Sequence, residues 1–224
     1  TVAVDDANSD NDFDAVADQT VSVDTTDDDV AGFTIVELDG ATEVDESGTT
    51  DTFTVVLDAQ PSDNVVIAMS SSDIGEATIS GTISFTPANW DTPQTVTVTG
   101  VDENTIDGDQ TSTITITIVD SISDSDFSNV ADQTVSVVTT DDDVAGFSIV
   151  ELDGSTEVDE SGTTDTFNVV LDAQPTSDVV LTITSDDTGE ATVNSPLTFT
   201  PANWDTPQTV TVTGVDEDIV DGTI

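Results

Sequence analysis

No side chain in this sequence can carry a positive charge. Lys, Arg and His are absent, and 48 of the 224 residues are Asp or Glu, which gives a formal net charge of −48. Two carboxylates about 4 Å apart repel each other by roughly 4 kcal/mol at an effective dielectric constant near 20, whereas a whole domain holds only about 5–15 kcal/mol of net stability. Clustered carboxylates in such a chain therefore need an external cation, or high salt, to stay folded.

The missing residue types exclude several classes of function. Without cationic side chains, the chain has no electrostatic surface for nucleic acid or for an anionic membrane. Without His, Cys and Lys, it has no Ser-His-Asp or Cys-His nucleophile, no Schiff-base lysine, no disulfide and no usual zinc site. Carboxylates, hydroxyls, amides and backbone carbonyls remain, and these are the ligands of hard cations such as Ca2+.

An internal repeat with a period of 114 residues runs through the chain. The segment Asp27–Phe33 recurs unchanged as Asp141–Phe147, and Trp90 recurs as Trp204 within a stretch of 16 identical residues. Ordinary solenoid units are much shorter, so this period does not indicate a solenoid. Each repeat is instead long enough to form a domain of its own.

The repeat divides the chain into three parts. Starting from Ala31 and Ala145, the two copies match at 57 of 80 positions. Residues 1–30 align with the last part of the first copy, so we expect them to be the C-terminal part of a preceding repeat. We expect residues 31–144 to form a complete β-sandwich repeat and residues 145–224 an incomplete following one.

Within one repeat, apolar and polar residues alternate with a period of two. Val or Ile alternates with Thr or Ser through Thr95–Thr99 and Ser112–Ile118. This alternation is typical of strands, and no stretch shows a good helical pattern. We expect about seven strands, at Phe33–Glu46 with a bend near Asp39 and Gly40, and at Asp51–Leu57, Asn64–Ser70, Thr82–Phe85, Gln94–Thr99, Ser112–Val119 and Gln133–Thr139.

Seven short strands in about 110 residues predict an all-β fold, a two-sheet sandwich of immunoglobulin-like architecture. The side chains expected in its core alternate along the strands. They are Phe33, Ile35, Phe53, Val55, Leu57, Val65, Ile67, Phe85, Trp90, Val96, Val98, Ile114, Ile116, Ile118, Val135 and Val137.

Strand direction predicts where the acidic loops lie. Antiparallel strands reverse at each loop, so acidic segments distant in sequence meet at one end of the sandwich. The acids expected there are Glu46, Asp102, Glu103, Asp107, Asp109, Asp141, Asp142 and Asp143. The next repeat begins at this end, and its loop with Asp172 and Asp178 faces the same junction.

Such a cluster predicts a calcium site, because Ca2+ takes about six to eight oxygen ligands. The loop Asp102–Asp109 lacks the spacing of an EF-hand, so the site would be assembled from separate loops. One alternative is that these are ordinary solvated loop acids. Another is a salt-adapted surface, which would spread acids evenly over the strands. The concentration of acids in loops favours ion sites.

The motifs of each repeat resemble a Calx-beta-type domain. They are the segment Asp27–Phe33 with the residues after it, the segment Val44–Gly48, and Val101–Glu103 with the acids after it. The resemblance implies calcium ligands at one tip of every copy. In the complete repeat these are Glu46, Asp102, Glu103, Asp107, Asp109 and Asp141 to Asp143. In the preceding copy they are Asp27, Asp28 and Asp29, and in the following copy Glu160, Asp216, Glu217 and Asp221.

Three departures from the family pattern stand out. Thr223 replaces the acid that corresponds to Asp109, and the closing aspartates of the following copy lie beyond Ile224. The second site is therefore expected to be incomplete here. The family's Gly-rich segment with Asp-Tyr is also missing, since the chain contains no Tyr.

The near-identical tandem copies and extreme acidity also resemble the extender repeats of RTX-type bacterial adhesins. That resemblance implies a non-catalytic spacer on a secreted protein of Gram-negative bacteria, held at the outer membrane, with calcium stiffening the linkers. The alternative is a carbohydrate- or protein-binding β-sandwich module of an extracellular protein. Exposed aromatic side chains would favour it, but Trp90 and Trp204 are the only indoles, and Trp90 is expected to pack at the core or an edge.

The partners expected from the sequence are the neighbouring repeats of the same protein. Nucleic acid and direct membrane insertion are not expected. Residues 1–30 lack a sandwich of their own, and residues 145–224 lack their last two strands. One chain could therefore complete another head to tail by strand addition.

Overall fold

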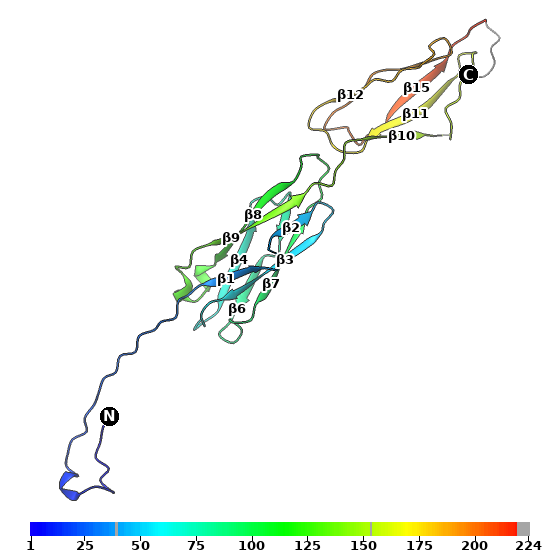
Figure 1. Ribbon diagram of the computed structural model, residues 1–224. Coiled ribbons are helices and arrows are strands. Elements are labelled where there is room, and N and C mark those ends of the chain that lie inside the picture. Colours follow the sequence, from blue (N-terminus) through cyan, green and yellow to red (C-terminus); the bar gives the residue numbers. More distant parts are fainter. Residues whose placement is uncertain (39, 153, 219–224) are drawn as a thin grey trace.

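The computed structural model describes residues 1–38, 40–152 and 154–218. Figure 1 shows an extended leading segment (residues 1–30), then a sandwich built from the first repeat, and then a second, smaller set of strands from the second repeat. The described residues contain only three short 3-10 helices, η1 (Asn11–Phe13), η2 (Asp120–Ile122) and η3 (Ser125–Phe127). None of the described helices is long and apolar enough to cross a membrane.

The first repeat is a β-sandwich of two sheets, which confirms the predicted fold class. One sheet is antiparallel and has the order β1-β3-β7-β5. Its strands are β1 (Phe33–Glu37), β3 (Thr50–Leu57), β7 (Gln94–Gly100) and β5 (Ala77–Ile79). The other has the order β2-β9-β8-β4-β6. Its strands are β2 (Thr42–Asp45), β9 (Gln133–Thr140), β8 (Gln110–Ile118), β4 (Val65–Ser71) and β6 (Thr82–Phe85).

The core lies between the two sheets and follows the alternation of the sequence. Along β3, for example, Phe53, Val55 and Leu57 are buried while the residues between them are only half-buried. Fourteen of the sixteen predicted core side chains are buried. The other two, Ile35 and Trp90, are half-buried and pack against the same core.

The prediction of one long bent strand over Phe33–Glu46 is wrong. β1 and β2 belong to different sheets, so the chain changes sheet between them, and Gly40 in the connection has φ +87°. β2 then pairs in parallel with β9, with Thr42 opposite Val137 and Asp45 opposite Thr140. This switch matters for the site, because it brings the end of β2 beside the end of β9.

The second repeat reproduces only part of this architecture in its described residues. The strands β10 (Phe147–Glu151), β11 (Thr164–Leu171), β15 (Gln208–Gly214) and β13 (Ala191–Val193) form a sheet with the order of the first antiparallel sheet. The opposing sheet has two described strands, β12 (Val179–Leu181) and β14 (Leu197–Phe199). The second core is correspondingly smaller.

Candidate metal centre

Glu46 lies at the centre of the acidic tip of the first repeat. Its backbone N–H donates to the carbonyl oxygen of Thr140 at 3.1 Å, which extends the β2–β9 pairing by one residue. The preceding residue, Asp45, is pressed against Gly100 at the end of β7, where a Cβ would lie 2.1 Å from the Asp45 carbonyl oxygen. Glycine is therefore required at position 100 for this end of β2 to reach its place.

The Glu46 side chain is fully buried, with 0% of its surface exposed. Neither of its carboxylate oxygens has a hydrogen-bond partner. Buried polar groups are nearly always paired, and an unpaired buried carboxylate is especially costly. Two such oxygens in one side chain require a ligand or a proton.

Two groups of acids converge on this carboxylate. One consists of Glu46, Asp141 and Asp143, and the other of Glu46, Glu103 and Asp107. Within each group, one oxygen from every residue lies within 4.8 Å of the others. Asp143 is half-buried, and its Oδ2 also has no hydrogen-bond partner. The structure thus has acidic clusters that could hold a metal ion.

Backbone hydrogen bonds fix the two segments that carry these acids. The N–H of Gly108 donates to Oδ2 of Asp141 at 2.8 Å, and the N–H of Asp143 donates to Oδ1 of Asp141 at 2.9 Å. The N–H of Asp141 in turn donates to Oδ1 of Asp109 at 3.4 Å. Asp141 and Asp109 therefore tie the loop after β7 to the segment after β9.

The electrostatics of the tip oppose ionisation. Burial, followed by the charges of Asp141 and Glu76 and then of the loop acids, raises the pKa of Glu46 to about 7. Burial is also the first cause of the raised pKa of Glu103 and of Asp143, with neighbouring carboxylates adding to it. Opposite charge or hydrogen bonds to the ionised form lower a carboxyl pKa, but no side chain here supplies the charge and neither carboxylate oxygen of Glu46 has a hydrogen-bond partner. A cation at the tip would reverse these shifts.

Glu76 is a further buried acid whose charge acts on Glu46, and it was not predicted. It is buried directly before β5, and its Oε2 has no hydrogen-bond partner. Burial and then the charges of Asp107 and Glu103 raise its pKa. The sequence did contain a signal, because Glu76 recurs as Glu190 within identical Gly-Glu-Ala-Thr tetrapeptides.

Three predicted ligands of this repeat stay outside the clusters. Asp102, Asp109 and Asp142 are exposed, and none belongs to a described acid group. Asp102 and Asp142 act on the site only through charge, as contributors to the raised pKa of Asp143. Asp109 acts through its hydrogen bond with Asp141.

In the second repeat the structure brings together Glu160, Glu190 and Glu217. They correspond to Glu46, Glu76 and Glu103, but Glu160 is exposed where Glu46 is fully buried.

The remaining predicted ligands that lie within the described residues are not gathered into a site. Asp216 is exposed and outside the described groups, and Asp221 lies outside the described residues. In the leading segment Asp27, Asp28 and Asp29 are all exposed, and the N–H of Asp29 donates to Oδ1 of Asp27 at 3.2 Å. That bond repeats the turn of Asp141 and Asp143.

Comparisons with known proteins reveal likeness at the level of structure only. No protein-family model matches the chain, and no curated protein matches it. The chain is similar to the calcium-binding domain CBD12 of CALX1.1, at 16% identity and a TM-score of 0.37, over 82% of this chain and 76% of that one. It is also similar to the apo form of the Calx CBD1 domain, at 18% identity and a TM-score of 0.36, over 50% and 98%.

The E. coli chaperone DraB is similar as well, at 6% identity and a TM-score of 0.35, over 73% of this chain and 75% of that one. Likeness at this level adds nothing about function. The class of the molecule therefore rests on its own geometry: an all-β chain with a sandwich whose tip carries a buried carboxylate cluster.

Proposed function

We propose that this chain is a non-catalytic extender segment of a large extracellular adhesin, stiffened by calcium bound at the tips and linkers of its repeats. One observation carries the proposal. Glu46 is fully buried with both oxygens unpartnered, and it faces four other acids in a chain that has no cationic side chain. A bound divalent cation supplies the missing counter-charge.

The donor set favours calcium over other ions. Every candidate ligand is a carboxylate oxygen, and the acids come from three separate segments that end at Glu46, Asp107 and Asp143. Ca2+ accepts many oxygens in irregular geometry, whereas Mg2+ demands a small octahedron and keeps its water. Zinc and the softer metals prefer nitrogen and sulfur ligands that this chain lacks.

The junction between the repeats supports a role in stiffening. The loop after β7 carries Glu103 and Asp107, and the three residues between them contact the second repeat. The N–H of Gln174 donates to the carbonyl oxygen of Asn104 at 2.6 Å, and the Thr105 hydroxyl donates to Oε1 of Gln174 at 3.3 Å. A metal held by Glu103 and Asp107 would therefore fix the segment that docks on the next repeat.

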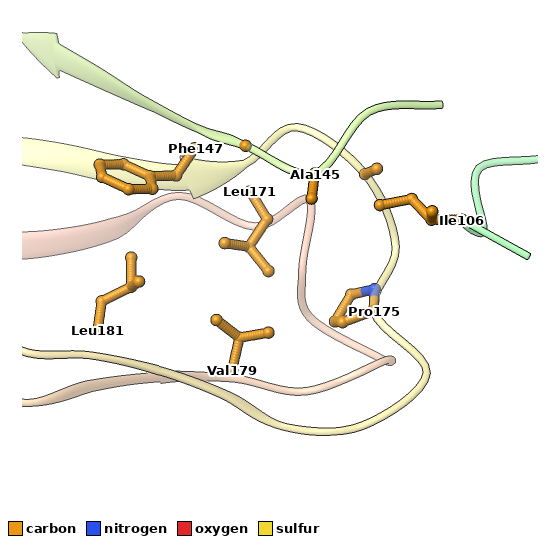
Figure 2. A pocket seen from close by; sticks show the side chains of 9 residues that line it. Ile106, Ala145, Phe147, Leu171, Pro175, Val179 and Leu181 are labelled. Carbon is orange, nitrogen blue, oxygen red and sulfur yellow. The ribbon is translucent and has the colours of Figure 1, made fainter. Parts of the chain in front are cut away.

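Ile106 completes this contact. Its side chain lines an apolar pocket at the base of the second repeat, beside Ala145 and Pro175 (Figure 2). Metal binding by Glu103 and Asp107 and docking of the residues between them on the second repeat would then be coupled, because both involve the same short loop after β7. Repeats joined in this way would form a rod that holds a distal binding region away from the cell.

The alternative function, a carbohydrate- or protein-binding module, is less well supported. Trp90 packs against the first core and Trp204 against the second, and both are half-buried. A sugar platform needs an exposed ring face, so these two indoles do not supply one.

Calcium dependence of the melting temperature tests the proposal. At a calcium concentration about 100 times the Kd, binding adds about 2.7 kcal/mol, which raises the melting temperature by roughly 5–10 °C above that in chelator. Mg2+ at the same concentration should give a much smaller rise. Calorimetry with Ca2+, Mg2+ and chelator measures all three states.

A pair of variants assigns the effect to the tip. Glu46→Gln should remove most of the calcium-dependent rise of the first repeat. The matched control is Glu43→Gln, the same substitution at an exposed position of β2, the strand directly before Glu46, and it should leave the rise intact. An equal calcium effect in Glu46→Gln and the unaltered chain would refute the assignment of the site.

A further inference from the structure

Two connections from the first repeat end on one short segment of the second repeat, Asp172–Gln174, which we call the receiving segment. One is the covalent linker, which meets the receiving segment at Gly146. The other is the loop after β7, which contacts Gln174 through Asn104 and Thr105. Two attachments on so short a segment restrict twisting as well as bending, because a single point of contact would still allow rotation.

The linker is held by Asp172. The N–H of Asp172 donates to the carbonyl oxygen of Gly146 at 3.0 Å, and the hydroxyl of Ser148 donates to Oδ1 of Asp172 at 2.7 Å. A Cβ at position 146 would lie 2.4 Å from Oδ2 of the same carboxylate. A larger residue at this position would therefore have to displace a carboxylate that Ser148 holds.

The loop is held by both the backbone and the side chain of Gln174. Its N–H donates to the carbonyl oxygen of Asn104 at 2.6 Å, and its Oε1 accepts from the Thr105 hydroxyl at 3.3 Å. The other end of the amide, Nε2, donates to the carbonyl oxygen of Pro201 at 2.7 Å. This last bond turns the amide oxygen toward the loop, so the site accepts a hydrogen bond there and does not donate one.

The first repeat shows that this arrangement of the amide forms before docking. Residues 58–61 and 172–175 have the same sequence, Asp-Ala-Gln-Pro. In the first copy Nε2 of Gln60 donates to the carbonyl oxygen of Pro87 at 2.7 Å, although none of the described hydrogen bonds joins Gln60 to a loop of another repeat. The loop can therefore dock on Gln174 without rearrangement of its amide.

The loops of the two copies differ where the receiving segments are identical. The first copy reads Asn-Thr-Ile at positions 104–106, and the second reads Asp-Ile-Val at 218–220. Isoleucine has no hydroxyl, so Ile219 has no side-chain donor for a glutamine amide in the place of Thr105. The loop, and not the receiving segment, therefore decides whether the side-chain hydrogen bond of such a junction can form.

We propose that the receiving segment is a register-specific docking site for the loop of the repeat before it, selective for a hydroxyl side chain at the position of Thr105. Thr105 and Gln174 form a parallel bridge, which sets the register. A loop shifted by one residue would turn Thr105 away from the amide, because successive side chains of an extended segment point to opposite sides. The role of this site in stiffening the junction rests on the proposed function.

The test is the distribution of distances between two spin labels, one on each repeat of the full chain, measured by pulsed electron paramagnetic resonance in Ca2+. The chain contains no Cys, so Ser136→Cys and Thr198→Cys give two defined labelling positions. Both are exposed strand residues that make no described contact at the junction. We expect a narrow distribution for the chain with no other change.

Variants on both sides of the contact assign the docking site. Gln174→Ala should lower the ratio of docked to undocked chains about 3- to 10-fold, because a side-chain hydrogen bond is lost, and broaden the distribution. Thr105→Ile should broaden it similarly, whereas Thr105→Ser keeps the hydroxyl and should leave it narrow. The matched control is Gln60→Ala, which removes the same amide and the same bond to a prolyl carbonyl oxygen but should leave the distribution narrow.

A second pair of variants tests the linker. Gly146→Ala should broaden the distribution or move its mean, because the new Cβ displaces the Asp172 carboxylate. Gly32→Ala is the matched control, since a Cβ there would lie 2.5 Å from Oδ2 of Asp58 but away from the junction. An unchanged distribution in Gly146→Ala would overturn the part assigned to the linker.

The remaining outcomes separate this inference from the proposed function. Equally narrow distributions in Gln174→Ala, Thr105→Ile and Gln60→Ala, with the calcium-dependent melting temperature intact, would overturn the docking site and leave the proposed function standing. A distribution that broadens in Gln174→Ala, in a chain whose melting ignores calcium, would support the docking site and overturn the proposed function. Broadening in Gln174→Ala without broadening in Thr105→Ile would support docking and overturn the selectivity for a hydroxyl. The two variants lie on different repeats, so a folding defect in one leaves the other to decide.

Discussion

Two identical glutamates show how strongly the surroundings control a single carboxylate. Glu46 and Glu160 stand in the same sequence, but Glu46 is fully buried and Glu160 is exposed. In the first repeat the segment that carries Asp141 and Asp143 meets Glu46, whereas the described acids beside Glu160 are Glu190 and Glu217. A buried carboxylate among acids is unfavourable without metal, so its titration reports directly on the state of the site.

In chelator, we expect the first repeat to become more stable as the pH falls. The folded pKa of Glu46 is about 7, above its ordinary value of 4.5, so the folded state binds more protons than the unfolded state between these values. Stability therefore falls as pH rises through this window. Glu76, Glu103 and Asp143, with raised pKa values, act in the same direction.

Denaturation in urea at several pH values between 5 and 8 measures this dependence. The other acids of the chain also make its stability depend on pH. Glu43→Gln should leave this pH dependence almost unchanged, whereas Glu46→Gln should reduce it by the contribution of one buried carboxyl group. Saturating Ca2+ should flatten the curve, because the metal replaces the proton. Identical pH dependence in the two variants would show that Glu46 does not titrate in this range.

At the scale of elements, the loop between β8 and β9 is held in place by a buried acid whose carboxylate, unlike that of Glu46, is fully hydrogen-bonded. Asp124 is buried, and its Oδ2 accepts from the N–H of Ser62 at 2.6 Å and from that of Asp63 at 2.9 Å. The hydroxyl of Ser62 and the N–H of Asp126 also donate to this carboxylate, at 2.8 and 3.0 Å. These hydrogen bonds lower its pKa to about 2, with the bond from Asp126 first. Asp124 needs no metal because backbone donors satisfy it.

Asp124→Ala should lower the stability of the first repeat by about 2–3 kcal/mol, because it leaves buried donors without an acceptor. Asp10→Ala is the matched control: Asp10 holds the same place in the exposed leading segment and should have no effect on melting. Asp124 contributes fully above pH 3.8, and this contribution is lost as the pH falls toward 2. An Asp124→Ala chain that melts like Asp10→Ala would show that the loop is held by other contacts.

The sequence predicted the elements whose signal is local. The alternation of Thr95–Thr99 and Ser112–Ile118 marked two central strands correctly, and nearly all predicted core positions are buried. The crossing between β1 and β2 was missed because β2 is stabilised by β9, about 95 residues away, and not by its own sequence.

The site, like the fold, could be predicted only where strand direction or a local pattern in the sequence indicates it. Strand direction predicted that Glu46, Glu103 and Asp107 would meet the segment after β9, and the structure brings them together. It did not distinguish Asp141 and Asp143 from the exposed Asp142 between them, because that choice depends on a turn. Glu76 was missed because it lies before β5, a three-residue strand too short to show alternation.

At the scale of the whole molecule, the junction joins two sandwiches through a small contact. Thr105 bridges Gln174 in parallel pairing, and Ile106 lies at the edge of the apolar pocket of the second repeat. In Figure 1 the second repeat follows the first as a separate body along the direction of the chain. A contact of this size limits bending only while its loop is itself held in place, and in the proposed function a metal ion bound by Glu103 and Asp107 would hold that loop.

Ile106→Ser should therefore loosen the junction between the two repeats without unfolding either repeat. Ile106 is 39% exposed, so its loss removes about 1 kcal/mol of docking and little from either core. Small-angle scattering in Ca2+ should show a broader distribution of lengths, close to that of the unaltered chain in chelator, while the calcium-dependent melting temperature stays unchanged. The control is Ile74→Ser, at a side chain of the first repeat that is 74% exposed and does not line the pocket. If Ile106→Ser keeps the narrow distribution that chelation broadens, calcium stiffens the junction without this docking contact, and the coupling through the loop is wrong.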